Sequence, residues 1–338
     1  MPRVALVTGA TGMVGSHIVE QLVAAGWTVR GLVRSDASAS FVSSLGAEPL
    51  RGDVMDTESL LRAARGCDVL FHTAAAITAG GGWERYRALN VDGTNAVIHA
   101  AETSGARLLQ LSSVAYYGAT GRYTKGGKTT EETPPGELRE RSYYARSKRE
   151  SEDLVLAAHR SGRIWATAVR PCVIYGPRDR QFVPRMASAL SFGVMPVLGG
   201  GRSTLAVVHA ANVASGAILA ATSDVAGGRA YNLANDFDVT VRDFFRLAAS
   251  GLDKRVRFVP VSRWLAKAGL GAFQLFDRVA LGGRFAVATE GSLTFLSRDN
   301  PFSSDRARRE LGWSPTMTPE IGIPAAFRWW KENKKGAT

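Results

Sequence analysis

Residues 4–15 read Val-Ala-Leu-Val-Thr-Gly-Ala-Thr-Gly-Met-Val-Gly, and this stretch decides the fold. The apolar run 4–7 predicts a buried strand. Four apolar residues then recur on one helix face: Ile18, Val19, Leu22 and Val23. The chain therefore passes from a strand through a glycine turn into a helix, whose free N-terminal amides suit the diphosphate of a dinucleotide. The competing interpretation is an ordinary glycine-rich turn, because the spacing is Gly-x-x-Gly-x-x-Gly rather than Gly-x-Gly-x-x-Gly.

Apolar strands and amphipathic helices continue to alternate along the first half of the chain. Strand candidates lie near residues 3–7, 28–33, 47–51, 68–72, 107–111 and 164–170. Helical stretches separate them at 12–25, 57–65, 84–103 and 142–160. This order predicts an α/β fold with a doubly wound parallel Rossmann sheet and a ligand site at the carboxyl ends of its strands.

A second informative stretch is Ser-Tyr-Tyr-Ala-Arg-Ser-Lys at residues 142–148. Tyr144 and Lys148 are four positions apart, so they share one face of a helix. We expect the ammonium of Lys148 to favour the phenolate and to lower the pKa of Tyr144, so that the tyrosine exchanges protons near neutral pH. A Tyr-x-x-x-Lys spacing alone is weak evidence for a catalytic pair. The glycine turn upstream is what supports this interpretation.

The chain resembles the extended short-chain dehydrogenase/reductase family in the order of its glycine turn, the pair Ser112 and Ser113, and the pair Tyr144 and Lys148. Further stretches agree with that family: Gly52-Asp53-Val54, Ala74-Ala75-Ala76, Asn90-Val91-Asp92-Gly93-Thr94 and Leu311-Gly312-Trp313-Ser314-Pro315. The run Arg-Pro-Cys-Val-Ile-Tyr-Gly-Pro-Arg-Asp at residues 170–179 looks most like the 3β-hydroxysteroid and sterol-4-carboxylate dehydrogenase branch, with the dihydroflavonol reductases nearby. The resemblance covers nearly the whole chain.

This resemblance implies two domains. Residues 1–177 would form the dinucleotide-binding domain, with about 206–235 returning to it through a strand near 229–233. Residues 178–205 and 236–330 would form a smaller substrate-binding domain, mostly C-terminal.

Three residues carry the expected chemistry, the exchange of a hydride and a proton at a carbonyl group. Tyr144 is the candidate acid, or the base for the reverse oxidation. Ser113 would donate a hydrogen bond to the carbonyl oxygen as it becomes alkoxide-like, and Ser112 is the runner-up. The family's Ser-x-x-x-Tyr-Gly run selects Ser113, counted back from Tyr117-Gly118. Lys148 resembles the family lysine that also holds the nicotinamide ribose.

The family pattern also implies which residues contact the cofactor. They are Gly9, Thr11, Gly12, Met13, Val14, Arg34, Asp53, Val54, Ala74, Ala75, Tyr144, Lys148, Pro171 and Val173. Asp53 resembles an aspartate that contacts adenine, and its alternative is a plain turn aspartate.

The end of the second strand selects between two cofactors. An NAD site carries Asp or Glu about 20 residues beyond the last glycine, whereas a basic residue there accommodates the 2′-phosphate of NADP. Arg34 stands at that position, and its guanidinium suits a phosphate. We therefore expect NADP(H), with NAD as the alternative. Asp36 favours NAD instead, because a shift of two positions would place its carboxylate on the ribose 2′-hydroxyl.

Several features stay open in the sequence. The polar segment 118–141, between the candidate serine and tyrosine, is either a lid or a disordered bridge. Asn90 either positions a water or braces its loop. Tyr143 stands where the family commonly has proline, and residues 209–212 lack the acidic residues of many relatives.

Composition narrows the class further. The chain has 338 residues, 45% of them hydrophobic, enough for one large domain with a smaller one. Cys67, Cys172 and five scattered histidines predict neither a disulfide nor a metal site. We find no signal peptide and no apolar run of about 18 residues that would span a membrane, so the expected location is the cytoplasm.

The net charge of +12 raises the question of polyanionic partners. No nucleic-acid motif is present, so no nucleic-acid partner is expected. The segment 256–285 places Trp264, Leu265, Phe273 and Phe276 among basic residues, as an interfacial helix does, and the alternative is that it caps its own domain's core. We expect a hydrophobic small molecule as substrate, with peripheral membrane contact and a homodimer as open options.

The sequence favours an NADP(H)-dependent oxidoreductase that interconverts a secondary alcohol and a ketone on a sterol-like or β-keto acid-like substrate. The first alternative is a nucleotide-sugar epimerase or dehydratase, which uses the same serine, tyrosine and lysine but retains tightly bound NAD. Arg34 argues against it. The second alternative is a non-catalytic NADP-sensing protein, although such proteins tend to lose the Tyr/Lys pair, which is intact here.

Overall fold

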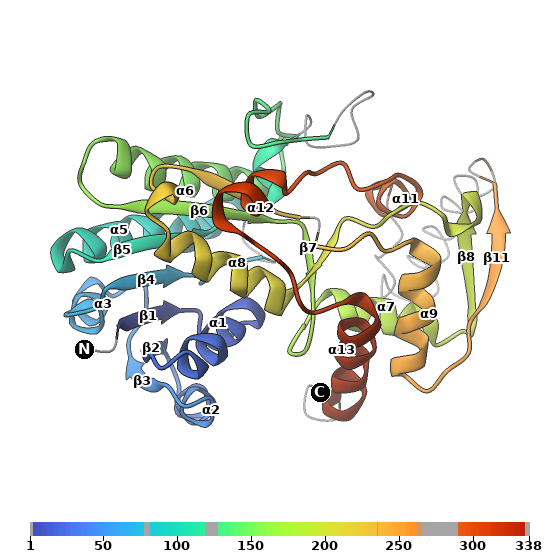
Figure 1. Cartoon of the computed structure of the whole chain (residues 1–338), viewed down its shortest axis with the longest axis horizontal. Helices are drawn as coiled ribbons and strands as arrows, with labels where there is room; N and C mark the ends of the chain where they lie inside the picture. The colour runs from blue at the N-terminus through green and yellow to red at the C-terminus, as the bar shows by residue number, and fades with distance from the viewer. Residues whose placement is uncertain are drawn as a thin grey trace. The chain divides into compact units, whose positions relative to one another are not determined.

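The computed structural model describes residues 3–77, 82–118, 128–234, 236–262, 264 and 290–334. The chain divides into two units, whose elements are shown in Figure 1. The first unit comprises Met1–Cys172, Ala210–Asp236 and Phe302–Thr316. The second comprises Val173–His209, Phe237–Pro301 and Met317–Thr338.

A parallel sheet of seven strands forms the centre of the first unit, in the order β10-β6-β5-β4-β1-β2-β3 (Figure 1). The strands are β1 (Val4–Thr8), β2 (Thr28–Val33), β3 (Glu48–Arg51), β4 (Val69–His72), β5 (Arg107–Leu111), β6 (Ala166–Pro171) and β10 (Ala230–Leu233). All neighbouring pairs are parallel, and the order reverses between β1 and β4, as in a doubly wound sheet. The predicted fold class is confirmed.

Helices cover both faces of this sheet (Figure 1). α1 (Met13–Ala24) packs against α8 (Ala210–Thr222) over one face. Over the other face, α5 (Gly93–Ser104) packs between α3 (Thr57–Ala64) and α6 (Tyr143–Arg160). The shorter helices of this unit are α2 (Asp36–Ser44), α4 (Gly82–Tyr86), η2 (Val114–Tyr117), η4 (Asp224–Ala226) and α12 (Asp305–Leu311). Fully buried side chains join the second helix layer to the strands: Leu6, Leu60, Leu70, Val97, Leu108 and Val155.

Two elements of this unit differ from the sequence prediction. The helix expected over 84–103 is instead α4, a π-helix η1 (Arg87–Asp92) and α5. Such π segments recur at functional sites, and this one carries Asn90. Helix α2 was not predicted, because its sequence is rich in serine. It begins because Ser35 Oγ accepts a hydrogen bond from the Ser38 amide at 3.2 Å.

In its described residues, the second unit contains two pairs of parallel strands and a helical layer. β7 (Val173–Tyr175) pairs with β9 (Val207–His209), and β8 (Val194–Leu198) pairs with β11 (Arg257–Val261). The helices are α7 (Phe182–Leu190), η3 (Gly199–Gly201), α9 (Val241–Gly251), α11 (Glu290–Ser297) and α13 (Pro319–Asn333). Their aromatic core centres on Phe244, whose ring meets those of Tyr175, Phe245 and Phe327.

The boundaries of the units differ from those that we expected for the domains. Residues 173–177 and 206–209 belong to the second unit, since β7 pairs with β9 there. Residues 302–316 belong to the first unit rather than to the expected substrate domain. Phe302 forms a bridge with Thr129, and Ser304 Oγ accepts from the Ala234 amide at 3.0 Å, which attaches this segment beside β10.

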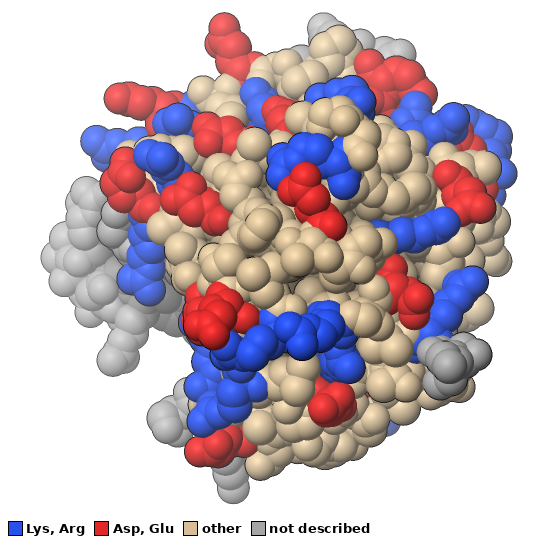
Figure 2. Space-filling model, turned by 90° about the vertical axis from the view of Figure 1, so that its left-hand side faces the viewer, with Lys and Arg blue, Asp and Glu red and all other residues tan. Residues whose placement is uncertain are grey.

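The charged side chains are dispersed over the face shown in Figure 2, where Lys and Arg lie among Asp and Glu with neutral areas between them. None of the helices in the described part of the chain has the length and hydropathy needed to cross a membrane. Within the same residues, no group of three or more His, Cys, Asp and Glu side chains is arranged to hold a metal ion. Cys67 and Cys172 are both buried thiols.

The turn after β1 depends on glycine at two positions. Gly9 has a φ of 72°, in the left-handed region, and a Cβ there would lie 2.7 Å from the Ala74 nitrogen. Gly15, in the first turn of α1, would place a Cβ 2.2 Å from the Gly9 carbonyl oxygen. The Gly12 amide donates to that same oxygen at 2.8 Å. The helix N-terminus therefore lies directly against the turn.

We expect Gly15→Ala to lower the free energy of unfolding by about 1–3 kcal/mol, because the new methyl group would overlap backbone atoms that cannot move independently of the turn. Gly93→Ala is the matched control in a helix, since the nearest atom to its Cβ would lie 3.4 Å away, an ordinary contact. Urea unfolding of both variants measures the difference. Equal stability would contradict the close packing of helix and turn.

Candidate active site

Ser113, Tyr144 and Lys148 come together at the carboxyl end of β5. Tyr144 and Lys148 lie one turn apart on α6, and Lys148 Nζ donates to the carbonyl oxygen of Leu111, the last residue of β5, at 2.7 Å. Ser113 precedes η2, where its Oγ accepts from the Ala115 amide at 3.1 Å. The Ser113 side chain also lies near enough to the phenol of Tyr144 to lower the pKa of that phenol. The structure thus gathers the three residues that the sequence singled out.

The surroundings of Tyr144 also distinguish the two candidate serines, since Ser113 and not Ser112 affects the pKa of its phenol. Ser112 is buried, and its amide donates to the Val169 carbonyl at 2.8 Å. Its Oγ has no hydrogen-bond partner among the described residues, whereas Ser113 Oγ meets the phenol of Tyr144. The geometry favours Ser113.

The ionisation of Tyr144 differs from the prediction. Burial raises the pKa of Tyr144 above its ordinary value; the Ser113 side chain opposes this and the nearby Tyr86 adds to it. Our expectation that Lys148 lowers this pKa is wrong, because its ammonium is directed at the Leu111 carbonyl and desolvation of the phenol dominates. At neutral pH Tyr144 is a protonated phenol, able to donate a proton.

Lys148 is a buried ammonium. Only 4% of its surface is exposed. Burial lowers the pKa of Lys148 from 10.5 to about 8, and the carboxylate of Glu152 partly opposes this shift. Glu152 lies one further turn along α6, so Tyr144, Lys148 and Glu152 share a helix face. The lysine therefore keeps its positive charge at neutral pH.

A buried histidine braces the strand ends beside this lysine. Burial, with the charge of Lys148, lowers the pKa of His72 to about 3, so the ring is neutral. Its Nδ1 lies 2.7 Å from Thr8 Oγ1, and its Nε2 lies 3.2 Å from Thr94 Oγ1. Because the Thr94 hydroxyl donates to the Asn90 carbonyl, Nε2 carries the ring proton and Nδ1 accepts from Thr8. The chain of bonds joins β1, β4 and the π-helix.

Asn90 holds the loop after β4. Its Oδ1 accepts from the Ala76 amide at 2.7 Å, and its Nδ2 donates to the Ala76 carbonyl at 3.0 Å. The same Nδ2 donates to Ser147 Oγ at 2.9 Å, which connects the loop to α6. These contacts favour the bracing interpretation of Asn90.

The residues after β1 and β4 fit a dinucleotide diphosphate. Gly12 is the N-cap of α1, no side chain caps this helix, and its first turn holds no acidic residue, so its amides suit an anion. Ala74 and Ala75 follow β4, and the Ala74 amide lies against Gly9. Thr11 and Met13 are partly exposed beside the turn, whereas Val14 and Val54 are buried. Pro171 ends β6 in the first unit, and Val173 begins β7 in the second.

Two arginines stand at the carboxyl ends of β2 and β3. Arg34 Nη1 lies 3.5 Å from Asp53 Oδ2, and Arg51 Nη2 lies 3.0 Å from Asp36 Oδ1. The Arg34 side chain is 76% exposed. Arg51 was missed in the sequence, since only the register that pairs it with Val33 brings it to the end of β2. Asp36, the residue that favours NAD, is thus paired with an arginine.

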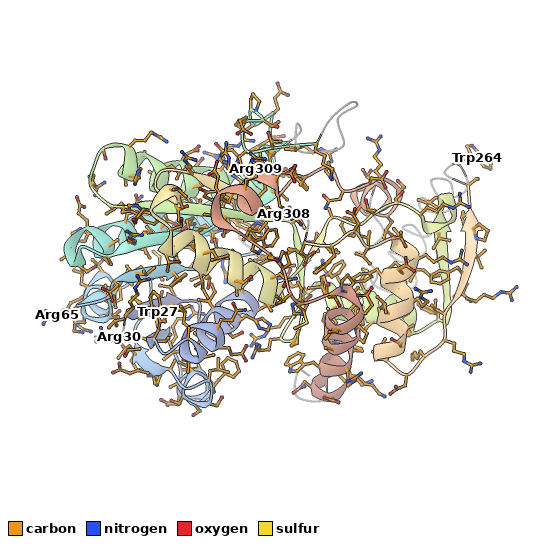
Figure 3. All side chains as sticks on the ribbon, viewed as in Figure 1. Trp27, Arg30, Arg65, Trp264, Arg308 and Arg309 are labelled. Carbon is orange, nitrogen blue, oxygen red and sulfur yellow. The ribbon has the colours of Figure 1, made fainter. Side chains whose placement is uncertain are left out.

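Arg30 points to the other edge of the sheet, near Trp27 and Arg65 (Figure 3). Its Nη1 donates to the carbonyl oxygen of Arg65 at 2.7 Å. Arg30 is therefore not part of the phosphate site. Asp53 has a turn role as well, because its Oδ1 accepts from the Met55 amide at 3.0 Å.

The segment between the catalytic serine and tyrosine is described from residue 128 onward. The Thr129 carbonyl accepts from the Ser303 amide at 3.0 Å, and Glu131 Oε1 accepts from the Asn232 amide at 2.7 Å. This part of the segment is therefore attached to β10. Residues 119–127 lie outside the described residues, and with them the choice between a lid and a disordered bridge.

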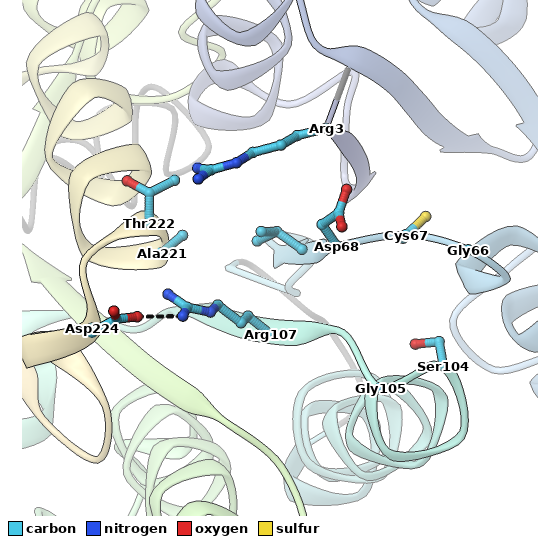
Figure 4. A pocket seen from close by; sticks show the side chains of 11 residues that line it. Arg3, Gly66, Cys67, Asp68, Ser104, Gly105, Arg107, Ala221, Thr222 and Asp224 are labelled. Atoms are coloured by element: carbon cyan, nitrogen blue, oxygen red, sulfur yellow. Dashed lines mark hydrogen bonds and ion pairs between the residues drawn. The ribbon is translucent and has the colours of Figure 1, made fainter. Parts of the chain in front are cut away.

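A pocket of about 620 Å³ lies at the opposite, amino edge of the sheet (Figure 4). Arg3, Asp68 and Arg107 line it at the starts of β1, β4 and β5. Arg107 is paired with Asp224 there. Because α5 and α8 end at this pocket, their carbonyl ends disfavour a phosphate. This pocket is therefore a poor candidate for the diphosphate of a dinucleotide.

Known proteins similar to this chain include several reductases. The profile of the NAD dependent epimerase/dehydratase family matches residues 5–234. A 4-hydroxy-2-methyl-3-oxo-4-farnesyl-3,4-dihydroquinoline-1-oxide ketoreductase from Stigmatella aurantiaca is 34% identical, covering 94% of each chain. A 2-alkyl-3-oxoalkanoate reductase from Stenotrophomonas maltophilia is 30% identical, covering 94% of this chain and 96% of the relative.

Other matches bear on the predicted branch and on the fold. A 3β-hydroxysteroid dehydrogenase/Δ5→4-isomerase from Mycobacterium tuberculosis is 30% identical, covering 94% of this chain and 88% of the relative. The crystal structure of gox2253 is 29% identical, with a TM-score of 0.75 and 98% of each chain covered. A UDP-glucuronic acid 4-epimerase from Bacillus cereus, 19% identical with a TM-score of 0.73 over 97% of this chain and 99% of its own, shares the fold alone. The predicted resemblance is confirmed.

We expect Lys148 to lose its proton near pH 8, the value to which burial lowers its pKa. Glu152→Gln should move this titration to lower pH, since the carboxylate raises the pKa of Lys148. NMR of protein labelled at the lysine ε-carbon follows the titration, and Lys148→Arg identifies the resonance. Titration of the parent protein near 10.5 would contradict the burial of this ammonium.

Proposed function

Because the chain belongs to the NAD dependent epimerase/dehydratase family, we propose that it is an NADP(H)-dependent oxidoreductase that interconverts a secondary alcohol and a ketone on a hydrophobic substrate. The observation that carries the proposal is the placement of Ser113, Tyr144 and Lys148 at the carboxyl end of β5. A proton donor and a second hydroxyl lie near each other there, one helix turn from the buried charge of Lys148. The reductases and dehydrogenases among its relatives support this class of reaction.

The mechanism assigns one task to each side chain. The reduced nicotinamide supplies a hydride when bound. Tyr144 gives its phenolic proton to the carbonyl oxygen, so that hydride and proton together convert the ketone to the alcohol. Ser113 holds the same oxygen through a hydrogen bond that strengthens as negative charge develops. Lys148, held by the Leu111 carbonyl, would bind the nicotinamide ribose, as the family resemblance implies.

The protonation state of Tyr144 supports reduction as the direction at neutral pH. Ketone reduction consumes a proton, and the raised pKa of Tyr144 keeps that proton on the phenol. Oxidation of the alcohol would need the phenolate, which forms only at higher pH. The protonated phenol is thus the form that ketone reduction uses.

The arginines at the ends of β2 and β3 support NADP(H) as the cofactor. Arg34 follows the end of β2, where a 2′-phosphate would lie in a site of this kind. Arg51 adds a second guanidinium at the same strand ends. The N-terminus of α2 begins beside them at Ser35 and favours an anion in the same place. Asp36 would select NAD only if released from Arg51.

The names of two relatives support a substrate class. One acts on a 2-methyl-3-oxo compound with a farnesyl group, and the other acts on 2-alkyl-3-oxoalkanoates. Both names describe a ketone beside an alkyl-substituted carbon. We infer that the substrate of this chain carries such a ketone on an apolar chain or ring system, which includes β-keto acids and sterol-like compounds.

A substrate screen tests the proposal. Purified protein with NADPH is offered 2-alkyl-3-oxoalkanoates, 3-oxosteroids, dihydroflavonols and nucleotide sugars, and the nicotinamide absorbance is followed. We expect oxidation of NADPH with one of the apolar ketones. Conversion of a nucleotide sugar without net change in absorbance, by protein that retains NAD, would establish the epimerase alternative instead. No turnover of any compound would favour the NADP-sensing alternative.

We expect Tyr144→Phe to reduce turnover by roughly 10²–10⁴-fold, the usual contribution of a positioned acid. Cofactor affinity should be preserved, since only the hydroxyl is lost. Tyr143→Phe is the matched control, because the neighbouring phenol cannot share the helix face of Lys148. Steady-state kinetics and NADPH titration of both variants decide the point. Near-normal turnover by Tyr144→Phe would remove this residue from the mechanism.

We expect Arg34→Ala to weaken NADPH binding by about 1.5–3 kcal/mol, the worth of a hydrogen bond to a charged group, and to leave NADH almost unchanged. Fluorescence titration with both cofactors measures the two affinities. Arg30→Ala is the control, since that guanidinium is bonded at the other edge of the sheet. If the parent protein binds NADPH and NADH equally, neither Arg34 nor Arg51 selects the cofactor.

We also propose peripheral contact with anionic membranes, from which an apolar substrate would be collected. Most of the segment 256–285 lies outside the described residues. Its described part exposes Val259 and Trp264, 39% and 73% of their surfaces, close to exposed Arg255 and Arg257. We expect the protein to co-sediment with anionic vesicles at low salt and to be released at high salt. Absence of binding at low salt would refute membrane contact.

A further inference from the structure

One buried guanidinium connects the two parts of the catalytic site. Arg170 lies in β6 and is 4% exposed. Its Nε donates to both carboxylate oxygens of Glu152 at 3.0 Å, and its Nη2 also donates to Glu152 Oε1. Its Nη1 donates to the Tyr117 hydroxyl at 2.8 Å. The guanidinium carbon lies 3.8 Å from the ring centre of Tyr116.

The partners of Arg170 belong to the two elements that carry the catalytic hydroxyl groups. Glu152 is on α6, two turns beyond Tyr144. Tyr116 and Tyr117 form the end of η2, whose N-cap is Ser113. We propose that Arg170 is a positioning residue, which sets the approach of the Ser113 hydroxyl to the Tyr144 phenol by fixing η2 against α6. The roles of those two hydroxyl groups rest on the proposed function, but the geometric claim does not.

The outer side of η2 is held to the same helix. Arg149 donates to the Tyr116 carbonyl through Nε at 2.9 Å and through Nη2 at 2.7 Å. The Tyr116 hydroxyl donates to Asp153 Oδ1 at 3.2 Å. These exposed or partly buried contacts restrict η2 from one side only. Arg170 completes the restraint from the sheet side, where water does not compete.

The guanidinium of Arg170 contributes a fixed geometry in addition to its charge. A buried ion pair adds little net stability, because desolvation offsets the attraction between its members. The planar fork of Arg170 nevertheless satisfies the Glu152 carboxylate and the Tyr117 hydroxyl while its face stacks on Tyr116. A lysine ammonium would supply the charge without the fork or the flat face. Arg170→Lys therefore separates positioning from charge balance.

The test follows the phenol of Tyr144 directly, in protein labelled at the tyrosine ζ-carbon, by NMR at neutral pH without substrate or cofactor. Tyr144→Phe identifies the resonance. Ser113→Ala removes the hydroxyl that lies near the Tyr144 phenol and gives the reference displacement. We expect Arg170→Lys to displace the Tyr144 resonance in the same direction by a comparable amount. The Arg170→Lys/Ser113→Ala double variant should add nothing, because both changes act through the approach of the same hydroxyl.

A pair of variants at Tyr116 repeats the test without touching the buried charges. Tyr116→Leu removes the ring on which Arg170 stacks and should displace the Tyr144 resonance as Arg170→Lys does. Tyr116→Phe keeps the ring, loses only the bond to Asp153, and should leave the resonance at the parent position. Circular dichroism and thermal melting show whether each variant is folded. If Arg170→Lys does not fold, Tyr116→Leu tests the positioning role in its place.

Three outcomes would overturn the positioning role. They are an unchanged Tyr144 resonance in folded Arg170→Lys or Tyr116→Leu, additive displacements in the double variant, and no displacement in Ser113→Ala. A purely structural role would lower the melting temperature and leave the resonance in place. Because the readout needs no substrate, its failure leaves the proposed function standing. A failed substrate screen would likewise leave this geometric role intact.

Discussion

The hydrogen bond from Lys148 Nζ to the Leu111 carbonyl oxygen ties the catalytic helix to the end of a central strand. An ammonium is costly to bury unless polar groups compensate for lost water. The strand-end carbonyl does this, with the Glu152 carboxylate one turn further along α6. Since Tyr144 precedes Lys148 by one turn and Ser113 follows Leu111 by two residues, this one contact brings both hydroxyl groups to the same edge of the sheet.

The surroundings of this ammonium are otherwise neutral. His72 stays uncharged at neutral pH, and Tyr144 keeps its proton. Glu152 is compensated by Arg170. In such a site of low polarity, electrostatic interactions are stronger than in water. The bonds from Lys148 to the Leu111 carbonyl and from Arg170 to Glu152 are therefore stronger than they would be at the surface.

Most strands could be predicted, because buried parallel strands are short apolar runs, and β1 to β6 lie within two residues of their expected positions. The π-helix η1 could not, since one irregular turn hardly disturbs helical periodicity over 84–103. The candidate catalytic residues could be named from spacing and family resemblance, and the structure places the three of them at one strand end. The direction of the Tyr144 pKa shift could not, because spacing gives the position of Lys148 and not the burial of the phenol. Arg51 was likewise hidden until the β2–β3 register was known.

The cofactor end of the site bears on the choice between a reductase and an epimerase. Ion pairs between exposed side chains contribute only about 0–1 kcal/mol. The pairs Arg34–Asp53 and Arg51–Asp36 can therefore exchange a carboxylate for a phosphate at little cost. Under the proposed assignment, a cofactor phosphate held there by exposed arginines would be readily taken up and released. An enzyme that consumes NADPH needs this exchange in every cycle, whereas an epimerase regenerates its bound NAD in place and needs none.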